Sequence, residues 1–217
     1  MTVQTMLTLL MQGFLTTLAI FTLTLLGSLP LGLLVYFGKK SRIAPLRWLV
    51  NAYISIMRGT PLMLQLMVVY FGPNLLFGLS VSGNWRFTAV IIGFVINYAA
   101  YFAEIYRGGI ESIPQGQYEA AEVLGYTKTQ TFMKIILPQM VKRVMPSVTN
   151  EVITLVKDTS LANIIAVSEL FRAAKNEASR TASVEPLFVA GLFYLAMNGV
   201  VTLVFSYLTR RMDYYKD

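Results

Sequence analysis

The segment Glu119–Gly125 has the sequence EAAEVLG, and Ile135–Pro138, with the sequence IILP, begins ten residues after its glycine. Alanine and glutamate favour a helix, while Gly125 permits a tight turn or a close backbone approach. The leucine and proline of the second segment are expected to close a second short helical element. This stretch therefore predicts two short helices joined by a turn, within a polar and basic loop over residues 108–145.

The sequence on either side of this loop is strongly apolar. Apolar residues make up 55% of the chain and charged residues 13%, and the mean hydropathy is +0.59, whereas an ordinary soluble domain is about 25% charged. A membrane-crossing helix needs about 20 apolar residues. The alternative is a large soluble helical core. We predict an all-α integral membrane protein with about five transmembrane helices, near residues 8–37, 48–72, 86–107, 146–165 and 186–209.

Several residue types and motifs are missing from the sequence. Cysteine and histidine are absent, which excludes disulfides, metal sites built from thiolates or imidazoles, and histidine-based catalysis. No Gly-x-x-x-x-Gly-Lys-Ser/Thr phosphate loop occurs, so the chain is not expected to hydrolyse ATP. The segment Met1–Leu10 carries no positive charge and no cleavage signal follows it, so the first apolar run is expected to be a retained helix.

The distribution of lysine and arginine predicts the orientation in the membrane. Twelve of these eighteen residues lie in or beside the loops 38–47 and 108–145 and the tail 210–217, and four lie on the opposite side. Positive residues accumulate in cytoplasmic loops, so we expect the loop 108–145 and the C-terminus in the cytoplasm and the N-terminus outside. The net charge of +7 then reflects topology and anionic lipid, with no nucleic-acid partner.

The second apolar span contains an interruption at Arg58–Pro61, with the sequence RGTP. Thr60 suits an N-cap and Pro61 the first helical position. A helix over residues 61–72 would be only about 18 Å long. We therefore predict a broken helix whose second half begins inside the membrane, where its free N–H groups can meet an anionic group of a substrate. A simple proline kink is the alternative.

Two carboxylates in the fourth span stand seven residues apart. Glu151 and Asp158 therefore share one helical face, and Lys157 points about 100° away from them. Charges inside a membrane must be paired or hydrated. The pair predicts a cavity that accepts a cationic ligand, unless cations on neighbouring helices neutralise both carboxylates.

The third span adds polar side chains. Asn97 and Tyr101 share a helical face and are expected to line the same cavity, although aromatic residues at this spacing are more often packing residues. Glu104 is a further candidate for substrate binding, and it can also pair with Arg107, three residues later.

Four segments together resemble a known family: Arg58–Leu62 (RGTPL), Ala103–Ile110 (AEIYRGGI), the EAA loop, and more weakly Lys157–Leu161 (KDTSL). They are similar to permease subunits of ABC importers. The EAA pattern is typical of the importers as a whole, and the first two segments narrow the resemblance to the polar amino-acid permeases for histidine, arginine and glutamine.

The resemblance implies a type I importer permease in a bacterial plasma membrane, with residues 1–217 as a single transmembrane domain. It implies two ATP-binding subunits that carry ATP and Mg²⁺, a second permease subunit (an identical copy or a paralogue), and an extracytoplasmic amino-acid-binding protein, with no cofactor in this chain and no metal site. The residues expected to couple to the ATPase are Glu119, Ala120, Ala121, Gly125, Leu137 and Pro138.

The expected substrate is an L-amino acid with a basic side chain, namely arginine, lysine or histidine. Glu151 and Asp158 would hold its cationic end and the break near Thr60 its carboxylate. The sequence Asn150–Ile153 (NEVI) looks like the form in basic amino-acid permeases, although related glutamine permeases also carry an acid nearby. The alternatives are an ATP-independent transporter that uses carboxylates as proton or sodium sites, for which inverted repeats are typical but not found, and a membrane scaffold subunit.

Overall fold

The computed structural model describes residues 3–80 and 84–212, and every regular element within them is helical. The predicted all-α fold class is confirmed. The elements are α1 (Val3–Lys39), α2 (Ala44–Gly59), α3 (Leu62–Phe77), α4 (Trp85–Glu111), α5 (Gln115–Val123), α6 (Lys128–Thr131), α7 (Leu137–Asp158), α8 (Leu170–Thr181) and α9 (Glu185–Arg211). A π-helical turn, Phe132–Ile136, joins α6 to α7, and a 3₁₀ segment, Thr159–Ile165, follows α7.

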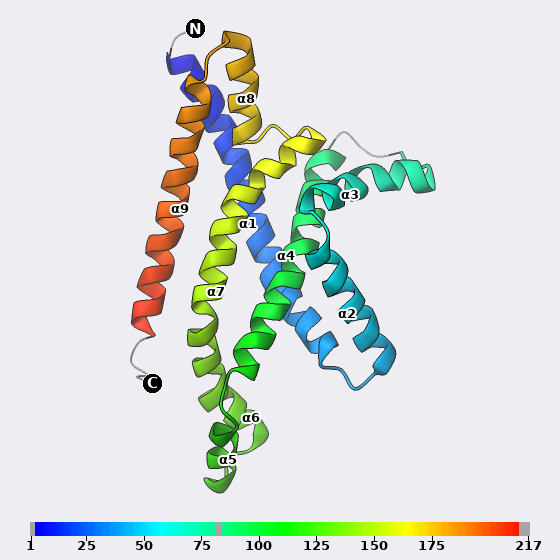
Figure 1. Cartoon of the computed structure of the whole chain (residues 1–217), viewed down its shortest axis with the longest axis vertical. Helices are drawn as coiled ribbons and strands as arrows, with labels where there is room; N and C mark the ends of the chain where they lie inside the picture. The colour runs from blue at the N-terminus through cyan, green and yellow to red at the C-terminus, as the bar shows by residue number, and fades with distance from the viewer. Residues whose placement is uncertain (1–2, 81–83, 213–217) are drawn as a thin grey trace.

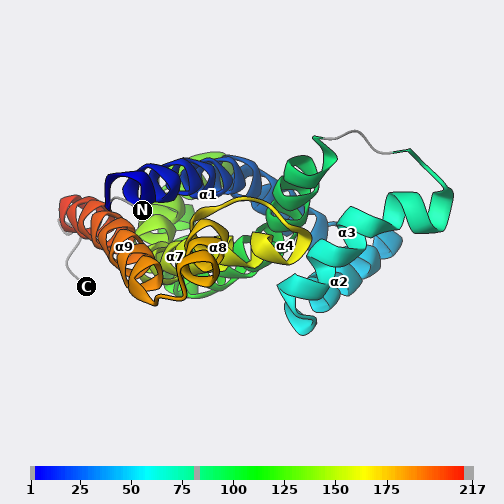
Figure 2. The same ribbon diagram turned by 90° about the horizontal axis from the view of Figure 1, so that it is seen from above.

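The long helices α1, α4, α7 and α9 run along the length of the molecule (Figure 1). The short helices α5 and α6 form one end, whereas α8 lies at the other end, beside the N-terminus. Seen from above, α2 and α3 extend from one side of this bundle (Figure 2). Three helices, α1, α4 and α9, are long and apolar enough to cross a membrane, and the bent pair α2–α3 provides a fourth candidate span.

Helix α4 is central, because it packs against α1, α2, α3 and α7. Its aromatic residues Phe94, Tyr98 and Phe102 are fully or almost fully buried and are the largest buried side chains of the core. Helix α1 approaches α4 closely at Gly32, where a Cβ would stand 2.8 Å from the Cβ of Phe102. A glycine at this position therefore permits the contact between the two helices.

The predicted break is confirmed, since the chain bends by 113° between α2 and α3. That the second half begins inside the membrane stays a prediction. The predicted cap is wrong in detail. Pro61 holds the N-cap position of α3, and Thr60 is the C-cap of α2. The Thr60 hydroxyl donates to the carbonyl oxygen of Ile56 (2.8 Å) at the end of α2, and it caps no backbone N–H group at the start of α3.

The role expected for Leu137 and Pro138 is also corrected. They begin α7 and do not close the preceding element, which runs into α7 through the π-helical turn. Proline is tolerated in a first helical turn because its missing N–H is not needed there.

Candidate functional site

A cavity of about 800 Å³ lies against α4, α7 and the end of α2. Its charged and polar walls include Arg58 from α2, Tyr101 and Glu104 from α4, and Asn150 and Glu151 from α7. Helices α4 and α7 come together at one end of the cavity because Gly109 has no side chain; a Cβ there would overlap with Val144. The side chains that line the cavity are therefore held mainly by two closely packed helices.

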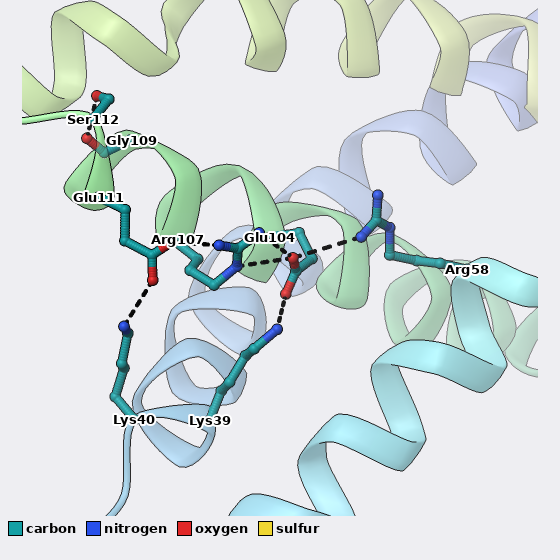
Figure 3. A network of polar contacts seen from close by, with 8 residues as sticks. All are labelled: Lys39, Lys40, Arg58, Glu104, Arg107, Gly109, Glu111 and Ser112. Atoms are coloured by element: carbon teal, nitrogen blue, oxygen red, sulfur yellow. Dashed lines mark hydrogen bonds and ion pairs between the residues drawn. The ribbon is translucent and has the colours of Figure 1, made fainter.

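Glu104 is the centre of an ion cluster (Figure 3). It pairs with Lys39 of α1, with Arg107 of α4 (2.9 Å) and with Arg58 of α2 (3.6 Å). The predicted pair of Glu104 with Arg107 is confirmed, and the two cations from other helices were not predicted. The side chain of Glu104 is only 12% exposed. The ion pairs of this largely buried carboxylate therefore connect α1, α2 and α4.

The cluster continues at the end of α4. Arg107 also pairs with Glu111, and the other carboxylate oxygen of Glu111 accepts a hydrogen bond from Lys40 (2.8 Å). This bond raises the pKa of Lys40, because it favours the charged ammonium form. Figure 3 shows the chain of contacts from Lys40 to Arg58.

Glu151 lines the same cavity but has a different environment. Its side chain is half-buried, and no lysine or arginine of residues 3–80 and 84–212 forms an ion pair with it. A half-buried carboxylate without an ion-pair partner is able to accept a cationic ligand.

Asp158 lies on the same helix as Glu151 but is not among the residues that line the cavity. The hydroxyl of Tyr98 donates a 2.8 Å hydrogen bond to its carboxylate, and Tyr98 itself is 1% exposed. The structure therefore attaches Asp158 to α4. Whether it also contacts a substrate stays a prediction.

The remaining predicted site residues separate into two groups. Tyr101 lines the cavity, and the guanidinium of Arg58 lies 5.4 Å from the centre of its ring. Asn97 and Thr60 instead lie at the break between α2 and α3, where both contact Gln65. Gln65 was missed from the sequence, although an amide within an apolar run was a signal of a polar contact inside the membrane.

The end formed by α5 and α6 matches the predicted pair of short helices. Gly125 has a φ of +77°, in the left-handed region that glycine adopts without strain, so the predicted turn is confirmed. Thr127 and Gln130 form a capping box that begins α6. Glu119 and Ala120 are exposed, and Ala121 is buried.

Two apolar side chains protrude at this turn. Val123 is 87% exposed and Leu124 is 72% exposed, and neither belongs to a candidate membrane span. Exposed apolar residues in a polar loop indicate a contact surface for another protein. We refer to Val123, Leu124 and Gly125 as the tip.

Comparisons with known proteins agree with this architecture. The family described as "Binding-protein-dependent transport system inner membrane component" matches residues 28–214. The arginine transport system permease protein ArtQ of Bacillus subtilis (strain 168) is 35% identical over 203 residues, which cover 93% of this chain and 91% of that protein. The probable glutamine ABC transporter permease protein GlnM of the same organism is 36% identical over 205 residues, 94% of this chain and 93% of that protein.

A solved structure, described as an amino acid ABC transporter with histidines, has a TM-score of 0.85 and 33% identity, and the match covers 97% of this chain and all of that one. The methionine ABC transporter MetNI, in an inward-facing conformation, shares the fold with a TM-score of 0.73 at 21% identity, covering 98% of this chain and 99% of that chain.

The helical fold and these matches show that the chain is a permease subunit of an ABC importer. The chain belongs to the family of binding-protein-dependent transport system inner membrane components. It is thus a pore-forming, non-catalytic subunit of a bacterial inner membrane, in a family that works with ATPase subunits and substrate-binding proteins.

Proposed function

We propose that this permease imports L-amino acids with a basic side chain, namely arginine, lysine or histidine. The observation that carries the proposal is Glu151, which lines the cavity without an ion pair in the described part of the chain, while Glu104 in the same cavity has three cationic partners. The similarity to an arginine permease supports this substrate class. The chain is also similar to a probable glutamine permease, whose named substrate has an uncharged side chain. The charge of Glu151 is therefore the feature to test.

In this proposal the carboxylate of Glu151 binds the cationic end of the substrate. Arg58, which lines the same cavity from the end of α2, meets the α-carboxylate, and the Tyr101 ring lies beside the Arg58 guanidinium. Asp158, two helical turns from Glu151, adds negative charge near this wall. The break near Thr60 contributes to binding of the substrate carboxylate indirectly. It ends α2 beside Arg58 and so sets the position of that arginine.

Transport is proposed to follow alternating access. Two ATPase subunits bind ATP and Mg²⁺ and dock on the loop 108–145, through the residues Glu119, Ala120, Ala121, Gly125, Leu137 and Pro138. Closure of the ATPase pair on ATP opens the pore outward, and hydrolysis followed by reset opens it inward. This chain supplies no cofactor. A second copy or a paralogue completes the pore, the N-terminus faces outward, and the C-terminus and the tip face the cytoplasm.

The test is uptake by the complete complex, reconstituted in liposomes with its ATPase subunits and its binding protein. We expect uptake of labelled arginine only when ATP is present on the ATPase side. The control is the same permease in liposomes without ATPase subunits, under an imposed proton or sodium gradient. Gradient-driven uptake in that control would contradict the proposal and support a secondary transporter.

A further inference from the structure

The break between α2 and α3 is held by two amide side chains that no part of the transport scheme explains. We infer that Gln65 and Asn97 are positioning residues, which fix this break and thereby place Arg58 in the cavity. The inference rests on the proposed function, because it assigns to Arg58 the contact with the substrate carboxylate.

The end of a helix leaves its last carbonyl groups without helical partners. At the end of α2, the Met57 carbonyl accepts from the Gln65 amide (3.0 Å) and from the Asn97 amide (3.1 Å). The Gln65 nitrogen also lies 3.1 Å from the Thr60 carbonyl oxygen and 2.8 Å from its hydroxyl oxygen. The two amides therefore supply the donors that the broken helix lacks.

The two amides also bind each other. The Asn97 nitrogen donates to the side-chain oxygen of Gln65 (2.9 Å), so three helices meet at one polar junction: α2 through Met57, α3 through Gln65 and α4 through Asn97. Asn97 is 4% exposed. Polar contacts are costly to lose where water does not replace them, so the junction is expected to hold the angle between α2 and α3.

The same face of α4 continues from this junction to the cavity. Asn97, Tyr101 and Glu104 stand at successive turns, because they are separated by four and three residues. Asn97 holds the end of α2 through Met57, and the next two side chains contact Arg58, at 5.4 Å from the Tyr101 ring centre and 3.6 Å from Glu104. Arg58 directly follows Met57, so the orientation of the arginine depends on the junction.

The cavity does not include Asn97 or Gln65 among its lining residues. Their effect on transport is therefore indirect. Loss of either amide should displace the Arg58 guanidinium and weaken substrate binding, while the tip and the ATPase contact stay unchanged. We expect a higher KM with little change in kcat.

The experiment uses ATP-driven arginine uptake by the complete reconstituted complex. Gln65→Met and Asn97→Leu keep the side-chain size and remove the amides, and each is expected to raise KM about tenfold. Asn51→Leu is the matched control, since Asn51 is an exposed amide on α2 for which the described residues offer no hydrogen bond. It should leave KM unchanged.

A second comparison separates positioning from general stability. In an Arg58→Met background, Gln65→Met is expected to cause less than a twofold further change in KM, because the arginine that it positions is gone. A full tenfold effect in that background would overturn the inference. If the wild-type complex itself shows no ATP-dependent arginine uptake, it is the proposed function that fails.

A structural measurement covers the case in which a variant does not assemble with its partners. The chain has no cysteine, so Ser55→Cys and Met67→Cys introduce one thiol on α2 and one on α3 of the full chain in nanodiscs. The distance between spin labels at these sites should shift or broaden in Gln65→Met, measured with unlabelled chain in excess. An unchanged distance distribution would overturn the inference.

Discussion

Glu104 and Glu151 line one cavity, yet the two carboxylates differ in their ion-pair partners. Glu104 sits among Lys39, Arg58 and Arg107, contributed by three helices. Glu151 faces the same space from α7 and has no ion-pair partner among the described residues. The carboxylate of Glu104 is neutralised by cations of the same chain. The carboxylate of Glu151 remains available to a cationic ligand.

Two residues of the same type therefore have different expected roles: the charge of Glu104 stabilises the fold, and the charge of Glu151 binds the substrate. Removal of Glu104 leaves three cations close together, which destabilises the fold. Removal of the Glu151 charge relieves an unpaired carboxylate, so it should cost transport and not stability. The tip resembles Glu151 in this respect, because the side chains of Val123 and Leu124 remain largely exposed in the described part of the chain.

The largest effect is expected at the tip. Leu124→Asp places a charge where an apolar side chain would be buried by the ATPase, and such central contacts are worth about 2–4 kcal/mol. We expect about a hundredfold weaker association of the permease with its ATPase, measured by titration in detergent, and a matching loss of uptake. Leu124→Met, which keeps an apolar side chain, is the control. If Leu124→Asp binds the ATPase as tightly as wild type does, the tip is not the contact surface for the ATPase.

The next effect concerns the contact that brings α4 and α7 together. Gly109→Ala introduces a Cβ that overlaps with Val144, and overpacking of this kind costs about 1–3 kcal/mol. We expect a lower thermal unfolding midpoint and reduced uptake. Gly108→Ala is the matched control, because no described atom outside its own helical neighbourhood lies within 4 Å of a Cβ there. Equal midpoints for the two variants would show that the contact does not hold the cavity together.

A smaller loss of stability is expected from Glu104→Gln. Its partners are between 23% and 44% exposed, so the cost should be about 1–2 kcal/mol, less than for a fully buried pair. Thermal unfolding in detergent measures it, with Glu151→Gln as the comparison. A lower midpoint for Glu151→Gln than for Glu104→Gln would reverse the assignment of the two carboxylates.

The smallest effect is at Lys40, whose side chain is 48% exposed beside Glu111. Lys40→Met should cost no more than about 0.5 kcal/mol, and 1 M salt should abolish the difference. The pKa of Lys40 is raised from 10.5 in the folded protein, so its stabilisation is complete below pH 10.5 and is lost as the pH rises through the folded-state pKa. Unfolding midpoints of the two proteins at pH 8 and above pH 11 test this, and a difference that persists in high salt would contradict it.

Local features of the fold were readable from the sequence. The apolar segments near residues 8–37, 86–107 and 186–209 predicted α1, α4 and α9, Arg58–Pro61 predicted the break, and Gly125 predicted the turn, because each depends on nearby residues only. The span predicted near residues 146–165 is not among the candidate spans of the described residues, since α7 carries several charged residues. The cap at Thr60 was assigned wrongly, since a threonine suits either end of a break. In the structure its hydroxyl donates to the carbonyl of Ile56, which places Thr60 at the end of α2.

The partners of the site residues could not be read in the same way. Whether Asn97 faces a cavity or the carbonyl of Met57 depends on the packing of α2 on α4, forty residues apart in the chain. The same holds for the hydrogen bond from Tyr98 to Asp158. Helical periodicity gives the face of a residue, and it does not give the element that covers that face.

The charge of Glu151 is the most direct test of the whole account. Uptake of arginine by the complete complex with Glu151→Gln should fall at least about thirtyfold relative to wild type, as expected for the loss of one partner of a desolvated charge pair worth about 2 kcal/mol or more, with the unfolding midpoint and the ATPase association retained. Asp158→Asn, measured in parallel, reports whether the second carboxylate contributes. If Glu151→Gln takes up arginine as wild type does, the unpaired carboxylate is not the substrate site and the account is contradicted.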